Sequence, residues 1–387
     1  MIENTLRELD ALVRTHTNRH VAGWKAGARP VVGYFCHYVP AEIILAAGAL
    51  PLRLRGAGSE DSAEGDAFMS SRVCTYVRHV VSLAMDGQFD FLDGAVCANT
   101  CDHVRRAADL FIKKTEIPFN GFLSVPRNPR ESLFPYYLEE LKKLIAGMEE
   151  SFGTKASDDA LREAIRAMNA NRARLHGINR LRLEDTPRLT GAEALAVHIA
   201  WQTLPQDVFA DLADQLLEEL PQRDMEKPRV RLVMAGAEMD EPAYMRAIES
   251  QGAVVVADLL CFGARSVLEE IDADAADPLE AVARAYFFQP SCARMIGDFP
   301  ARWELLKSTV REARAQGVVF QRLMFCDPWG AEIHNIMHRA QQEKAFPVLS
   351  LSREYGIVAT GQIRTRVQAF MEQIEIAGAQ AAAGGGA

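Results

Sequence analysis

The chain has 387 residues, of which 49% are hydrophobic and 25% are charged, and its 43 basic and 52 acidic side chains give a formal net charge of −9. This length favours two or three domains over a single core, and the composition excludes a disordered or fibrous protein. The acidic balance argues against nucleic acid or an anionic membrane as the main partner, so a small-molecule ligand is the better expectation.

The first third of the chain alternates between strand and helix patterns. An N-terminal helix is predicted over 1–28, where Pro30 ends the helical spacing, and a first α/β domain is predicted over 29–126. Strands that alternate with helices are typical of a parallel, wound sheet. The strands are expected at 31–36, 50–55, 92–97 and 117–125, and the helices at 40–49, 70–85 and 101–113.

The rest of the chain divides into a helical part and a second alternating part. Long charged amphipathic stretches, such as 137–150 and 158–174, predict a helical linker or insert over 127–227. A second α/β domain is expected over 228–376, and the alanine- and glycine-rich tail over 377–387 is expected to be disordered. Its strands are predicted at 229–236, 253–259, 318–325 and 346–351, and its helices at 242–251, 303–316 and 362–376.

Common nucleotide-binding and hydrolase motifs are absent from the sequence. No G-x-G-x-x-G follows a strand, and there is no Gly-Lys-Ser/Thr phosphate loop, no H-E-x-x-H and no G-x-S-x-G. The chain therefore has no evident site for a dinucleotide or a nucleoside triphosphate.

The N-terminus and the cysteines bear on the cellular compartment. No basic segment followed by an apolar segment begins the chain, and the longest apolar stretch, 43–52, is about half a membrane span. We therefore expect a cytoplasmic protein. The seven cysteines then do not form a disulfide framework, because a reducing compartment keeps thiols free; they are buried spectators, nucleophiles or metal ligands.

The placement of the cysteines follows the predicted strands. In wound parallel sheets, ligands bind outside the carboxyl ends of the strands, so cysteines at these ends should converge on a cleft if the two halves face each other. Two more cysteines, Cys74 and Cys101, lie near predicted helix starts, and Cys292 lies in a loop. The cysteines at predicted strand ends are Cys36, Cys97, Cys261 and Cys326.

Helix starts favour thiolates, because the free amide groups and the helix dipole stabilise negative charge there. A basic residue also follows three cysteines at a spacing of four, which puts it on the same face of a helix. The pairs are Cys74 with Arg78, Cys101 with Arg105, and Cys261 with Arg265. Thiolates are the form that ligates metals, so these positions are candidate metal ligands.

A buried, inert thiol is the ordinary interpretation of an isolated cysteine, and we keep it for Cys97. Zinc sites of the structural type usually use paired short knuckles, whereas these thiols are dispersed over the whole chain. An iron–sulfur cluster held between domains fits the dispersed pattern better.

Other ionisable residues near the cysteines have two interpretations each. His37 and His103 could donate protons near neutral pH, and a hydrogen-bonded structural imidazole is an equal alternative. For Glu42 and Asp327, capping or salt-bridging roles are favoured over a catalytic role. No catalytic residue is assigned from the sequence.

Three ordered strings resemble the 2-hydroxyacyl-CoA dehydratase and benzoyl-CoA reductase subunit family. They are GYFCHYVPAEI over 33–43, TCDHVRR over 100–106 and FCDP over 325–328, and their order and spacing match from about residue 5 to residue 376. The resemblance implies two Rossmann-like parallel-sheet domains with a 4Fe-4S cluster in the cleft between them. Carried over by motif, the three cluster ligands are Cys74, Cys101 and Cys326.

The resemblance also implies partners and a reaction. It implies a homologous second subunit or a homodimer, and a separate ATP-hydrolysing iron–sulfur activator that supplies a low-potential electron. In dehydratases of this family the electron reaches the carbonyl of a CoA thioester, and in the reductases it enters the aromatic ring. The absence of a phosphate loop agrees with ATP hydrolysis by another protein.

Three further thiols leave an alternative open. Cys36, Cys261 and Cys292 resemble the extra ligands of a branch of the family whose proteins hold a double-cubane 8Fe-9S cluster and reduce small molecules. Six cysteines would then serve as metal ligands. A third possibility is a protein that transfers electrons and catalyses nothing by itself.

Overall fold

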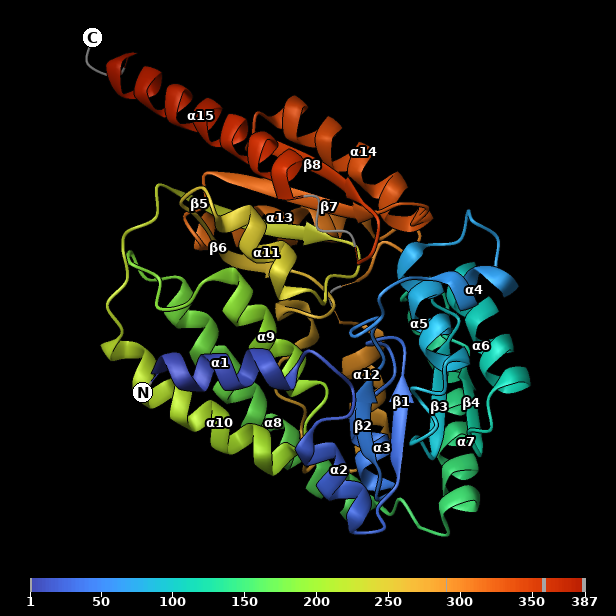
Figure 1. The fold of residues 1–387 in the computed structure, drawn as a ribbon. Coiled ribbons are helices and arrows are strands. Elements are labelled where there is room, and N and C mark those ends of the chain that lie inside the picture. Colours follow the sequence, from blue (N-terminus) through green and yellow to red (C-terminus); the bar gives the residue numbers. More distant parts are fainter. Residues whose placement is uncertain (1, 290, 357–359, 385–387) are drawn as a thin grey trace.

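Two four-stranded, all-parallel sheets form the frame of the molecule (Figure 1). The computed structural model describes residues 2–289, 291–356 and 360–384. The strand orders are β2-β1-β3-β4 and β6-β5-β7-β8, so both halves have the same topology. The predicted α/β class with two parallel sheets is therefore confirmed.

The first half contains the four expected strands at nearly the expected places. Valine-rich and leucine-rich runs form β1 and β2, whose residues are buried on both faces, as expected for a parallel sheet covered by helices. The elements are β1 (Val31–Tyr34), α3 (Ala41–Ala46), β2 (Leu50–Arg53), α4 (Ala63–Phe68), α5 (Thr75–Met85), β3 (Gly94–Ala98), α6 (Asp102–Lys114) and β4 (Phe119–Leu123).

The predicted helical segment between the halves is helical. Thr190 and Glu193 form a capping box that starts the third of its α-helices. The four α-helices are α7 (Phe134–Phe152), α8 (Asp158–Arg182), α9 (Gly191–Trp201) and α10 (Gln206–Glu219), with 3-10 turns at Glu131–Leu133 and Leu220–Gln222.

The second half repeats the alternation of strand and helix. Val254, Val255 and Val256 lie in β6, which has the predicted bounds. The elements are β5 (Val230–Gly236), α11 (Pro242–Glu249), β6 (Ala253–Leu259), a 3-10 turn at Ala264–Ser266, α12 (Pro278–Phe287), α13 (Phe299–Glu312), β7 (Gly317–Leu323), α14 (Asp327–Glu343), β8 (Val348–Arg353) and α15 (Thr360–Gly384).

Two terminal features differ from the expectation. The N-terminal segment forms two helices, α1 (Ile2–Leu12) and α2 (Arg19–Ala26), because Asn18 caps a new helix start by accepting from two backbone amides. At the other end, α15 continues past residue 376 to Gly384, where the tail was expected to be disordered. Alanine has the highest helix propensity, which accounts for the extension. Residues 385–387 of that tail lie outside the described residues.

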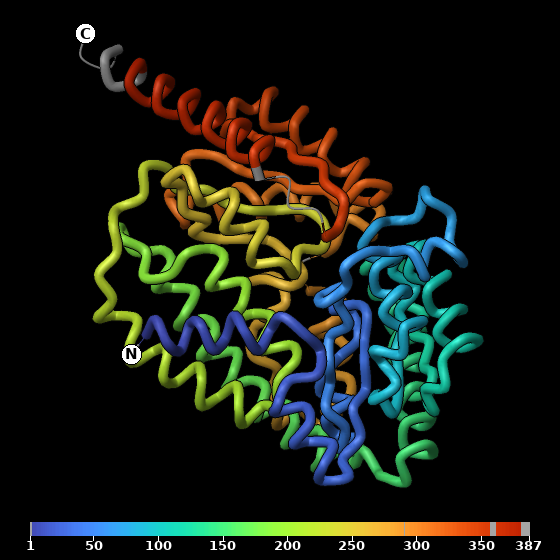
Figure 2. Tube along the Cα trace, in the orientation of Figure 1, coloured from blue at the N-terminus to red at the C-terminus, as the bar shows by residue number. Residues whose placement is uncertain are grey.

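The two halves and the helices between them share one hydrophobic core. Their buried side chains form a single continuous cluster. The tube in Figure 2 shows α1 lying beside the α9 and α10 segment, and α1 contacts both helices. Helix α12 of the second half packs on α7 and α8. The domain boundaries given above remain a prediction.

Each sheet has a topological switch point between its two central strands. After β1 the chain adds β2 on one side and β3 on the other, and β5, β6 and β7 repeat this pattern. Such a switch point leaves a crevice at the carboxyl ends of the two central strands. None of the helices within the described ranges has the length and apolar character needed to span a bilayer.

Candidate functional site

Three cysteines occupy the same position at the starts of three helices. Cys74, Cys101 and Cys326 are the N-cap residues of α5, α6 and α14, and none of the three side chains caps its helix by a hydrogen bond. The helix dipoles favour negative charge at all three positions.

Cys74 and Cys326 interact directly, although they come from opposite halves of the chain. A hydrogen bond from Cys326 lowers the pKa of the Cys74 thiol to about 5, with a further contribution from His103, while burial acts in the opposite direction. The same hydrogen bond raises the pKa of Cys326. The two pKa shifts have opposite directions, so the pair favours a thiolate at Cys74 over one at Cys326. His103 Nδ1 also accepts the backbone N–H of Cys74 at 3.1 Å.

Cys101 lies near this pair, and the pKa of its thiol is shifted in the opposite direction from that of Cys74. Burial is the main cause that raises the pKa of Cys101 to about 12, and the charges of Glu238 and Cys74 raise it further. The residue keeps some solvent exposure. As an isolated thiol it is neutral, so a positive metal centre would be needed to hold it as a thiolate.

The predicted role of basic neighbours is wrong for two of the three pairs. Arg78 binds Asp66 at 2.6 Å, and Arg105 lies on the exposed side of α6, 3.7 Å from Asp102. Each of these guanidinium groups pairs with a carboxylate instead. Only Arg265 acts on the cysteine expected for it, Cys261.

A second group of thiols lies in three loops. Cys36 follows β1, Cys261 follows β6 and Cys292 precedes α13, and all three are buried. The Tyr38 hydroxyl accepts the backbone N–H of Cys292 at 3.2 Å. Arg53 Nη2 lies 3.8 Å from the Cys261 sulfur. These contacts join the loop after β1 and the end of β2 with two loops of the second half.

Glu238 faces both groups of thiols. It lies two residues beyond the end of β5, and its charge acts on Cys101 and Cys326 in one group and on Cys261 and Cys292 in the other. Burial raises the pKa of Glu238 to about 6, although the residue keeps some exposure. The sequence reasoning missed this residue; its place at the carboxyl end of a central strand was the available signal.

The donor chemistry of these residues suits a soft metal centre. Within the described ranges, no group of three or more His, Cys, Asp or Glu side chains is arranged to hold a single metal ion. In a cluster, however, the protein thiolates bind different irons, so they surround the group rather than one atom. Six thiols in two neighbouring groups, with one already held as a thiolate, are compatible with such ligation.

Cys97 is separate from these groups. It lies inside β3, where its register partner is Phe122, and it is buried. Burial raises the pKa of its thiol. This fits its interpretation as an inert core residue.

Three other candidate residues from the sequence, Glu42, His37 and Asp327, differ in burial and in partners. Glu42 forms a buried ion pair with Arg172, as the salt-bridging interpretation predicted. His37 is buried, and burial lowers its pKa well below the usual value, so it is neutral. Asp327 is exposed in the first turn of α14.

A pocket of about 460 Å³ opens beside the first group of thiols. Cys101, His103 and Asp327 line one part of it. The other lining side chains include apolar and charged ones, so the pocket can receive a ligand with both characters. These side chains include Met295, Ile296, Phe299, Arg127, Arg302 and Glu332.

Comparisons with known proteins place these features in a family. A family model described as 2-hydroxyglutaryl-CoA dehydratase, D-component, matches residues 36–374. A subunit of benzoyl-CoA reductase from Thauera aromatica is 28% identical over 91% of this chain and 93% of its own length. The beta subunit of (R)-2-hydroxyglutaryl-CoA dehydratase from Acidaminococcus fermentans is 24% identical over 92% and 95%. The beta subunit of lactoyl-CoA dehydratase from Anaerotignum propionicum is 22% identical over 89% and 91%.

Proposed function

The chain belongs to the 2-hydroxyglutaryl-CoA dehydratase D-component family, and we propose that it is the iron–sulfur subunit of an enzyme that acts on a CoA thioester. The reaction is either the dehydration of a 2-hydroxyacyl-CoA or the reduction of a benzoyl-CoA type ring. Relatives named as subunits of both kinds of enzyme cover nearly the whole chain.

The observation that carries this proposal is the contact between Cys74 and Cys326 beside Cys101. All three lie at helix N-termini, where amide groups stabilise the negative charge of a cluster and its thiolates. A 4Fe-4S cluster held there would supply single-electron transfer at low potential. The chain itself positions the thiols, limits access of water by burial, and offers the adjoining pocket to the thioester.

The proposal includes two kinds of partner. The relatives are named as single subunits of a reductase and of dehydratases, which indicates that this chain works with a homologous subunit or with a second copy of itself. A separate ATP-hydrolysing iron–sulfur activator would deliver the electron, because the sequence has no phosphate loop of its own.

Anaerobic reconstitution tests the cluster. We expect about four irons and four sulfides per chain for one cubane, and an EPR signal after reduction. A reconstituted protein without iron and acid-labile sulfide would contradict the proposal. Turnover of a CoA thioester with activator, ATP and reductant separates an enzyme from a protein that only transfers electrons.

A second candidate is a reductase with a double-cubane 8Fe-9S cluster. It is supported by the proximity of Cys36, Cys261 and Cys292 to the first group, with Glu238 facing both groups. This candidate predicts about eight irons per chain, and loss of about half of them when these three cysteines are replaced together by alanine. A wild-type content of four irons would reject it.

A further inference from the structure

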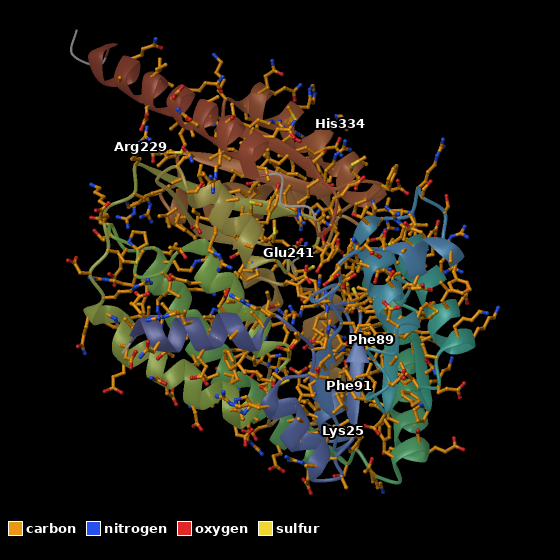
Figure 3. All side chains as sticks on the ribbon, in the orientation of Figure 1. Lys25, Phe89, Phe91, Arg229, Glu241 and His334 are labelled. Atoms are coloured by element: carbon orange, nitrogen blue, oxygen red, sulfur yellow. The ribbon has the colours of Figure 1, made fainter. Side chains whose placement is uncertain are left out.

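Buried arginines in this chain commonly have a carboxylate partner. A guanidinium keeps its charge at every pH a protein experiences, so burying it without an opposing charge is costly. The ion pair compensates for this cost. The buried pairs are Arg172 with Glu42, Arg182 with Asp258, and Arg353 with Glu241. Figure 3 labels Glu241, which lies at the start of α11.

Arg53 and Arg265 lack such a partner in the part of the chain that the structure describes. Their exposed fractions are 2% and 7%. Arg53 donates to the Phe35 carbonyl at 2.9 Å and to Gln202 Oε1 at 3.2 Å, both of which are neutral. Arg265 makes one long hydrogen bond, to the Ser291 carbonyl at 3.4 Å, and its Nε and Nη2 atoms have no hydrogen-bond partner.

Two other buried arginines without a salt bridge have a different explanation. Arg294 donates to backbone carbonyl groups, among them those of Thr100 at 3.1 Å and Val125 at 2.8 Å. Arg55 faces the charge of Asp240. Neither is directed at a group that gains charge only when a ligand binds.

The groups that face Arg53 and Arg265 are the sulfurs of the second thiol group and the carboxylate of Glu238, whose charge acts on both guanidinium groups without an ion pair among the described residues. Arg53 Nη2 lies 3.8 Å from the Cys261 sulfur, and Cys292 is the group whose negative charge would act most strongly on Arg265. Phe262 lies 4.4 Å from the Arg53 guanidinium and Trp329 lies 5.1 Å from that of Arg265. Each cation is therefore held by an aromatic ring and directed towards thiols.

We infer that Arg53 and Arg265 are the counter-ions of an anionic metal–thiolate centre on Cys36, Cys261 and Cys292. Metal binding deprotonates thiols, so the loaded protein adds negative charge beside both guanidinium groups to that of Glu238. The inference rests on the proposed iron–sulfur function. Both arginines would then act through the thiolates, by balancing the negative charge of the centre.

The test compares Arg265→Met with wild type in the metal-free and the reconstituted protein. Without metal, we expect the variant to unfold at the same or a higher temperature, because it loses a buried charge that no ion pair balances. After anaerobic reconstitution, we expect a lower iron content or a more negative midpoint potential, because a cation that stabilises the reduced state is gone. Arg265→Lys should keep the wild-type potential. Arg53→Met serves as the second variant if Arg265→Met does not fold.

Arg172→Met is the matched control. It removes a buried arginine whose partner Glu42 is present, so the metal-free variant should unfold at a lower temperature than wild type. An equal loss in metal-free Arg265→Met would overturn the inference, as would wild-type iron content and potential after reconstitution. A wild-type chain that takes up no iron would contradict the proposed function instead, and the metal-free comparison would still decide whether Arg265 lacks a partner.

Discussion

Cys74 and Cys326 meet across the two halves of the molecule, each at the start of a helix and joined by a hydrogen bond between their thiols. The first follows the loop after α4, and the second follows β7. The site therefore exists only while the two halves keep their relative position. Contacts between the halves and the chemistry of the thiols can be tested separately.

Replacing Cys326 by alanine is expected to remove most of the iron from the reconstituted protein. The substitution deletes one proposed ligand and also the donor that holds Cys74 as a thiolate. Iron and sulfide analysis with EPR after anaerobic reconstitution measures the effect.

Cys97→Ala is the control for that experiment. Cys97 is as deeply buried as Cys74 but lies inside β3, so the variant should keep wild-type iron and lose about 1 kcal/mol of unfolding free energy. Equal loss of iron in both variants would show that iron content reports stability and not ligation.

Tyr355→Phe is expected to lower the free energy of unfolding by about 1–3 kcal/mol. The Tyr355 hydroxyl donates to Asp240 Oδ2 at 2.7 Å, and Asp240 Oδ1 already has no partner. The Tyr355 backbone N–H also donates to the Thr75 hydroxyl of the first half at 2.9 Å. Denaturant unfolding followed by circular dichroism measures the change.

Exposed Tyr136 provides the comparison for that variant. Tyr136→Phe should change the unfolding free energy by less than about 0.5 kcal/mol, because its ring is 49% exposed. If Tyr355→Phe is equally neutral, the hydrogen bond to Asp240 does not contribute to the free energy of unfolding.

His198 is expected to make the protein less stable in mild acid. Burial lowers its pKa from 6.5 to about 4, so the unfolded chain binds one more proton between these values. The contribution of His198 is complete above pH 6.5 and is lost as the pH falls towards 4, by up to about 1.4 kcal/mol per pH unit. Its ring contacts the Ala194 carbonyl at 2.6 Å and Asn179 at 3.3 Å.

His198→Gln tests this dependence by denaturant unfolding at pH 5 and pH 7. The difference between wild type and variant should shrink at the lower pH, because the variant has no imidazole to protonate. The exposed His338→Gln variant should keep a constant difference from wild type. A His198→Gln difference that is the same at both pH values would rule out the role of His198.

The sequence predicted the sheets well and some helices poorly, for identifiable reasons. Strand β6 has the predicted bounds because its valines form an unbroken run between turn residues. Helix α9 was not predicted individually because it is buried almost all round, so it has no polar face to give a period. Helix α14 was missed because Pro328 and Gly330 in its first turn resemble a loop.

In the candidate site, the positions of cysteines beside strands were predictable from the sequence, whereas their side-chain contacts were not. The strand-end rule depends only on topology, and Cys36, Cys261 and Cys326 do lie just beyond strands. It was wrong for Cys97, the fourth cysteine it named, which lies inside β3. The partners of Cys74 depended on contacts between distant segments. Arg78, the cation expected beside Cys74, pairs with Asp66, and Cys326 is the main influence on the pKa of Cys74. No pattern in the sequence distinguishes such contacts.

Gly236→Ala is expected to disturb the segment that carries Glu238. Gly236 ends β5 with a φ of 129°, and an added Cβ would lie 1.8 Å from the Gln321 carbonyl oxygen. The same glutamine donates through Nε2 to the carbonyls of Ala237 at 2.6 Å and Glu238 at 3.0 Å, so movement of either strand displaces the carboxylate. We expect a loss of at least about 2 kcal/mol of unfolding free energy, and a lower iron content after reconstitution.

Gly23→Ala is the matched control for that loss. Gly23 lies in α2, no atom is within 4 Å of the position that its Cβ would take, and alanine favours helix, so this variant should be as stable as wild type or more stable. If Gly236→Ala behaves in the same way, the strand end adapts without cost and Glu238 is not held in place by the turn. If stability falls while iron content stays at the wild-type value, the position of Glu238 matters to the fold and not to the metal centre.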